Sequence, residues 1–155
     1  MTAMWRARVL WCCEVISCHS LAPVRGCTDS EIRGLAERTG FEVPEAYGLF
    51  LRLVGGEPGD FMRGYDLRFS VSERLDQRFR LLVSEMSGPP IPPGALVYFG
   101  SQDFQFWFML ADDGPDPEVF TYVDSDPTVF SAVGRTFSED LQQLVSEQYG
   151  VVFIH

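Results

Sequence analysis

The chain has 155 residues, of which 46% are hydrophobic and 14% aromatic, so it is long enough for one folded domain and too apolar to be disordered. Its formal net charge at pH 7 is −10, and residues 101–155 hold ten acidic residues against one basic residue, Arg135. A surface of that sign repels phosphate backbones, which argues against a nucleic-acid ligand, and it attracts a cationic partner.

The first segment, residues 4–18, fits two patterns. Its apolar side chains fall on one face of a helix, and they also alternate with polar ones as in a strand, but its length favours the helix. A signal peptide is not expected, because Glu14 stops the apolar run that follows Arg8, and no stretch is long enough for a membrane span. We therefore expect a cytoplasmic protein with no membrane contact. We divide the chain into a helical, cysteine-containing extension, residues 1–27, and a domain, residues 28–155.

Three helices are predicted in the next part of the chain. The first, over residues 28–40, opens with Thr28 and Glu31, which form a capping box, and ends at a glycine. The second, over residues 44–56, starts with a proline in its first turn and ends at two glycines. The third spans residues 72–86 with apolar residues at helical spacing.

Strands follow a stretch with four prolines, residues 88–94, which ends the helical part. The strand-like runs are residues 95–99, 104–110 and 119–123. The middle run is almost wholly apolar, as expected for a central strand covered on both faces. A second capping box at residues 136–139 opens a last helix, and residues 151–154 are predicted as a closing strand. This order predicts one α+β domain with helices packed on a central, mostly antiparallel sheet.

Candidate catalytic and metal-binding residues gather near the N-terminus. The four cysteines are Cys12, Cys13, Cys18 and Cys27. With His19 they could ligate zinc, but they lack the paired C-x₂-C spacing of structural zinc sites, so we interpret them as small buried side chains. No nucleophile motif surrounds His19. We expect no catalytic residue, metal or cofactor, and an enzyme that uses this cysteine-rich segment stays as a minor hypothesis.

Acidic residues crowd two turns in the last third of the chain. The candidate partner-binding residues are Asp112, Asp113, Asp116, Glu118, Asp124 and Asp126. Their spacing does not match the EF-hand loop, so a calcium site is disfavoured. Two interpretations remain: these are solvated turns of an acidic protein, or they form a negative surface that speeds association with a cationic partner.

Three stretches carry a family resemblance through their order and spacing. Residues 28–56 contain a first helix and then Val43-Pro44-Glu45-Ala46-Tyr47, which opens the second helix. Residues 97–124 contain two apolar runs and an acidic turn, and residues 135–141 open the last helix. In this order they resemble the opening helices, the paired central strands and the closing helix of the SUKH superfamily, the Smi/Knr-like proteins.

The resemblance implies a SUKH-like α+β fold without catalytic residues. It also implies a role that is common in bacteria, that of an immunity protein that neutralises a toxin domain by direct binding. Many such toxins are nucleases, so the implied partner is a basic toxin protein. The charge and the absence of a long apolar stretch predict that neither nucleic acid nor a membrane is a partner. The alternative is a SUKH-like regulatory or scaffolding module with no toxin partner.

Overall fold

The computed structural model describes residues 4–154. Within them the α-helices are α1 (Met4–His19), α2 (Asp29–Thr39), α3 (Glu45–Phe50), α4 (Ser72–Glu85) and α5 (Phe137–Tyr149). The strands of the main antiparallel sheet, in spatial order, are β3 (Ala95–Gly100), β4 (Gln105–Leu110), β5 (Glu118–Val123) and β6 (Ser131–Thr136). Short elements complete the fold: the paired strands β1 (Val24–Arg25) and β2 (Glu57–Pro58), the π-helical turn η1 (Leu51–Gly55) and the 3-10 turn η2 (Phe69–Val71).

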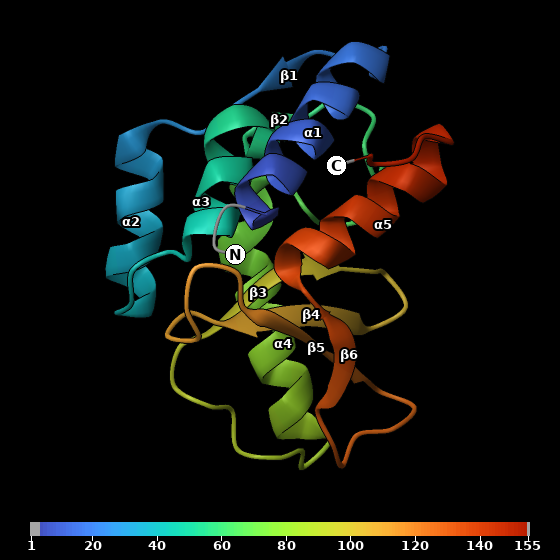
Figure 1. Ribbon diagram of the computed structural model, residues 1–155. Helices are drawn as coiled ribbons and strands as arrows, with labels where there is room; N and C mark the ends of the chain where they lie inside the picture. The colour runs from blue at the N-terminus through green and yellow to red at the C-terminus, as the bar shows by residue number, and fades with distance from the viewer. Residues whose placement is uncertain (1–3, 155) are drawn as a thin grey trace.

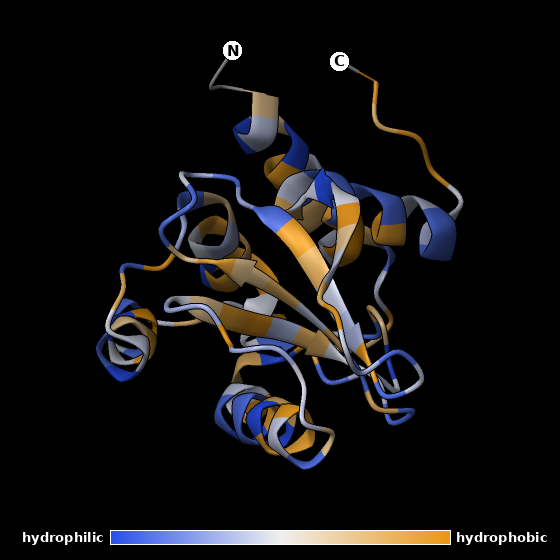
Figure 2. Ribbon diagram, turned by 90° about the horizontal axis from the view of Figure 1, so that it is seen from below, coloured by the Kyte–Doolittle hydropathy of each residue, from blue (hydrophilic) through white to orange (hydrophobic). Residues whose placement is uncertain are grey.

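The sheet lies between two helical layers. Helices α1, α3 and α5 cover one face, and α4 covers the other (Figure 1 and Figure 2). Along β4, Phe106 and Phe108 pack against Phe79 of α4, whereas Trp107 and Met109 belong to the core on the opposite face. The predicted α+β class and the central strand covered on both faces are therefore confirmed.

The helix starts and ends that the sequence predicts around α2 and α5 are confirmed as well. The Thr28 hydroxyl accepts from the Glu31 backbone N–H (3.1 Å), and the Glu31 carboxylate accepts from the Thr28 N–H (2.9 Å). The same capping box opens α5 at Thr136. Gly40 ends α2 and Gly150 ends α5, each with a positive φ (79° and 67°) that favours glycine.

The ambiguous first segment is a helix that contributes to the core. Val9, Cys12 and Ile16 of α1 are fully buried. They belong to the same hydrophobic cluster as Tyr98 and Met109 of the sheet, and α1 packs along α5 and against α3. None of the helices in the described part of the chain combines the length and the apolar character needed to span a membrane.

Two strand expectations differ from the structure. The sequence does not predict β6, because this segment has no apolar alternation and carries Gly134 at a φ of 85°. It is a strand because it pairs with β5, for example between Phe120 and Ala132. The closing strand predicted at residues 151–154 is wrong. This segment forms no strand, and the Phe153 ring packs on Trp11 of α1 with 5.4 Å between ring centroids.

Candidate functional site

The sheet places the six acidic candidates at two opposite ends. Asp112, Asp113 and Asp116 lie in the turn between β4 and β5, and Glu118 is the first residue of β5; we call these four the first acidic group. Asp124 and Asp126 follow the far end of β5 and form the second acidic group. Glu118 and Asp124 are six residues apart along β5, which corresponds to about 20 Å at about 3.4 Å per residue. The six carboxylates therefore do not make one cluster.

The turn that carries the first acidic group is anchored on two helix starts. The Pro115 carbonyl accepts from Ala46 N–H at the start of α3 (2.9 Å), and the Pro117 carbonyl accepts from Phe137 N–H at the start of α5 (2.8 Å). These contacts bring exposed Glu45 to the same end of the sheet.

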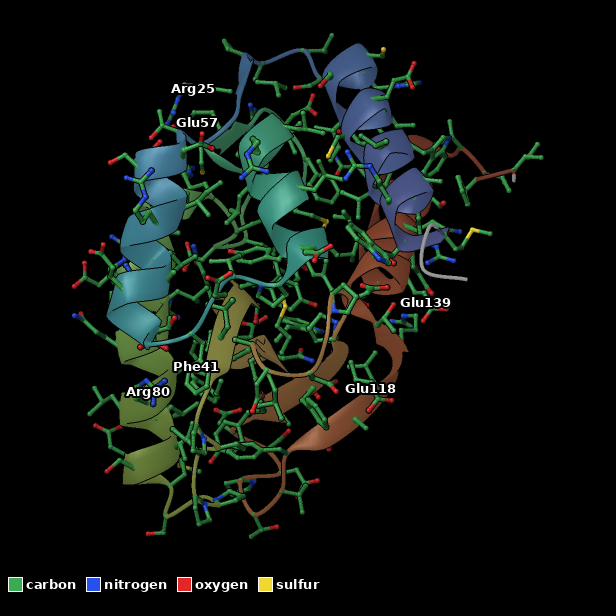
Figure 3. The ribbon with its side chains drawn as sticks, turned by 60° about the vertical axis from the view of Figure 1, so that its left-hand side comes forward. Arg25, Phe41, Glu57, Arg80, Glu118 and Glu139 are labelled. Carbon is green, nitrogen blue, oxygen red and sulfur yellow. The ribbon has the colours of Figure 1, made fainter. Side chains whose placement is uncertain are left out.

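Exposed Glu139 joins this end from the first turn of α5. Its carboxylate accepts from Thr136 N–H (2.9 Å), and Thr136 pairs with Glu118 across the sheet edge. Figure 3 shows Glu118 and Glu139 projecting on one side of the molecule. Glu45 and Glu139 are distant from the 112–118 turn in sequence, so only the folded structure reveals them as its neighbours.

Asp116 differs from the other members of its group, because its carboxylate is used inside the fold. One oxygen accepts from Ser138 N–H (2.8 Å), and the other accepts from the hydroxyls of Thr136 and Ser138 (both 2.7 Å). Ser138 is fully buried, and its hydroxyl also accepts from Arg8 of α1 (2.9 Å). Asp116 therefore ties the turn to the start of α5.

We expect Asp116→Ala to lower the free energy of unfolding by about 2–3 kcal/mol, because it leaves three donors without their carboxylate, one of them a buried N–H. The matched control is Asp112→Ala, which removes an exposed carboxylate and should change stability by less than about 0.5 kcal/mol. Urea unfolding of both variants and the wild type measures the difference. Equal stability of the two variants would contradict this role of Asp116.

The second acidic group shares its end of the sheet with the turn between β3 and β4. Gln105 pairs with Val123, so the residues just beyond this pair, Phe104 and Asp124, belong to adjoining turns. Burial, followed by the charge of Asp124, raises the pKa of Tyr122. Exposed Asp103 also lies in the β3–β4 turn.

The cysteines of the N-terminal segment are mostly buried in the structure. Burial raises the pKa of Cys13 to about 12 and that of Cys27 to about 11, and it raises the pKa of Cys12 as well. These side chains are therefore neutral thiols, while thiolates are the form that attacks a substrate or binds a metal. Cys18 is exposed. Among residues 4–154, no three His, Cys, Asp or Glu side chains come together as metal ligands.

His19, the other candidate for catalysis or metal binding, makes contacts within the fold. Its Nδ1 lies 3.0 Å from the Val15 carbonyl, and its ring packs on Tyr149 with 5.5 Å between centroids. Both contacts place it at the end of α1 against the end of α5. The second histidine, His155, lies outside the described residues.

A comparison with protein-family models matches most of the chain to one family. The model of the SMI1/KNR4 family (SUKH-1) matches residues 26–145. The match begins after α1 and runs through the whole sheet into α5. A comparison with curated proteins finds no match.

Proposed function

The chain belongs to the SMI1/KNR4 family (SUKH-1), and on this basis we propose that it is a non-catalytic immunity protein that binds a cognate toxin domain and neutralises it by direct contact. The toxin is a basic protein, and a nuclease domain fits best, because a nuclease must attract phosphates to its active site. An acidic protein that covers such a site uses the same attraction to block it.

The observation that carries the proposal is the set of exposed carboxylates without a cationic partner. Asp112, Asp113, Glu118, Asp124 and Asp126 are exposed, and within residues 4–154 none of them forms an ion pair. Arg135, the basic residue of this part of the chain, pairs with buried Asp140 instead (2.9 Å). The surface charge is therefore free to steer a cationic partner.

Co-expression with the product of the adjacent gene tests the proposal. If that product is a toxin, co-expression of this chain should restore growth, and the two proteins should purify together. Growth that is not restored, with no complex formed, would refute the immunity function. A stable complex without any effect on growth would favour the alternative, a regulatory or scaffolding module.

We expect that neutralising the acidic groups slows association with the toxin. Because steering acts on the encounter rate, Asp124→Asn with Asp126→Asn, or Asp112→Asn with Asp113→Asn, should lower the association rate constant at low salt by about tenfold and flatten its salt dependence. Stopped-flow kinetics at several salt concentrations measures both effects. Asp116 is left unchanged because its carboxylate supports the fold.

The matched control removes two exposed carboxylates elsewhere, through Glu37→Gln on α2 and Glu73→Gln on α4. This double variant has the same net charge as the double variants above, so it separates the local field from the overall charge. If all three double variants associate alike, neither acidic group steers the partner.

A further inference from the structure

Next to the second acidic group, a large aromatic side chain lies exposed in a strained turn. We propose, on the basis of the proposed function, that the basic toxin docks here and inserts an arginine or lysine side chain against Phe104. The Phe104 surface consists of Phe104, Leu81, Leu82, Glu85, Asp103, Asp124 and Asp126. It joins the β3–β4 turn, the C-terminal half of α4 and the turn after β5.

Phe104 is held in an unfavourable conformation with its ring in solvent. Its φ is 59°, in the left-handed region that a bulky side chain rarely adopts, and 50% of the residue is exposed. The turn is closed by Ser101 N–H, which donates to the Gln105 carbonyl (2.9 Å). Neither the strain nor the exposure stabilises the fold, and strained backbone positions of this kind cluster at active sites and ligand-binding sites.

The ring lines a hollow against the outer side of α4. The hollow has a volume of about 90 Å³, and Leu81, which is 59% exposed, forms its wall with Leu82 and Glu85. Arg78 also lines it, but the Arg78 guanidinium pairs with Asp66 (2.6 Å) and lies over the Phe106 ring (5.6 Å to its centroid). The hollow therefore offers apolar walls and the carboxylate of Glu85.

Carboxylates without a cation lie in this hollow, as Glu85, and in the two turns that adjoin Phe104, as Asp103, Asp124 and Asp126. In the described part of the chain, Glu85, Asp103, Asp124 and Asp126 form no ion pair. The remaining basic residue on this side of α4, Arg74, lies one turn nearer the N-terminus of the helix than Arg78. Carboxylates beside an exposed apolar centre are complementary to a positively charged protein surface.

These features favour an arginine or lysine as the inserted group. The aliphatic stem of such a side chain packs on Phe104 and Leu81, its cation is attracted to the face of the aromatic ring, and Glu85 accepts its hydrogen bonds. The second acidic group steers the encounter, and the Phe104 surface supplies the contact that holds the complex.

Phe104→Asn tests the proposal, because asparagine adopts a positive φ more readily than phenylalanine and removes the ring. We expect the affinity for the adjacent-gene toxin to fall at least about tenfold, as for an aromatic hot spot, while the midpoint of thermal unfolding stays the same or rises. Isothermal titration calorimetry and thermal unfolding measure the two quantities. The control is Leu21→Asn, which changes a side chain that is 98% exposed and far from this surface in the sequence. The Leu21→Asn variant should bind the toxin with the affinity of the wild type.

The outcomes separate this proposal from the proposed function. If the wild type does not bind the toxin, the immunity function itself fails, and this docking surface with it. If the wild type binds and Phe104→Asn binds within twofold of it, the Phe104 surface is wrong and the function stands. If Phe104→Asn fails to fold, Leu81→Asn on the exposed side of α4 decides, with the same expected loss of affinity.

Discussion

Deletion of residues 1–27 is expected to leave a chain that does not fold. Val9, Val15 and Ile16 of α1 are buried, and at about 1.5–3 kcal/mol each their burial contributes about 4.5–9 kcal/mol. That is comparable with the whole free energy of unfolding of a typical domain, about 5–15 kcal/mol. The deletion would also expose the apolar sides of α3 and α5 that α1 covers. Circular dichroism and a thermal melt of the truncated chain measure the result.

Point substitutions on α1 provide the graded control. Ile16→Ala should lower the free energy of unfolding by about 2–5 kcal/mol because it opens a cavity in the core. Leu10→Ala, at an exposed position of the same helix, should change stability by less than about 1 kcal/mol. A truncated chain that still unfolds cooperatively, with the aromatic circular dichroism of the intact protein, would show that residues 28–155 fold alone.

Substitution of Asp140 is expected to have the next largest effect. Asp140 lies in the first turns of α5 and is only 3% exposed. Its carboxylate accepts from the Tyr98 hydroxyl (3.0 Å) and from the Arg135 guanidinium (2.9 Å). Burial and then the Asp140 charge hold the pKa of Tyr98 well above its usual value, so this phenol stays protonated as the donor.

Asp140→Ala should therefore lower the free energy of unfolding by about 3–5 kcal/mol, since it leaves a buried hydroxyl and a half-buried cation without their acceptor. Urea unfolding at neutral pH measures the loss. Tyr98→Phe removes only the donor, so it should cost about 1 kcal/mol.

The double variant Asp140→Ala with Tyr98→Phe serves as the control. It should cost less than the sum of the two single variants, because the phenylalanine no longer leaves a buried donor unsatisfied. Strict additivity, or a loss below about 1 kcal/mol for Asp140→Ala alone, would contradict a structural role for this network.

Part of the candidate site could be predicted from the sequence. The excess of carboxylates in residues 101–155 and their position in turns are visible in the order of residues. Their division into two groups is not, because it depends on the hairpin that sends β5 back along β4. The same holds for Asp116, whose hydrogen-bond partners lie 20 and 22 residues further along the chain.

Phe104 shows a further limit of sequence patterns. As the first residue of an apolar run, Phe104 is predicted to lie in the central strand with its neighbours. In the structure β4 begins at Gln105, and Phe104 turns outward with a positive φ. Apolar patterns assume a regular backbone, so they cannot identify the residue at which the backbone leaves the strand.

Features that depend on a few neighbouring residues follow from the sequence alone. The capping boxes at Thr28 and Thr136 and the glycine that ends α2 act within one helical turn, and the apolar run of β4 follows from burial on both faces. Only the folded chain shows that α1 completes the core, that residues 131–136 form a strand, and that the acidic groups lie apart. These features arise from contacts between residues far apart in the chain, whose energies local propensity does not contain.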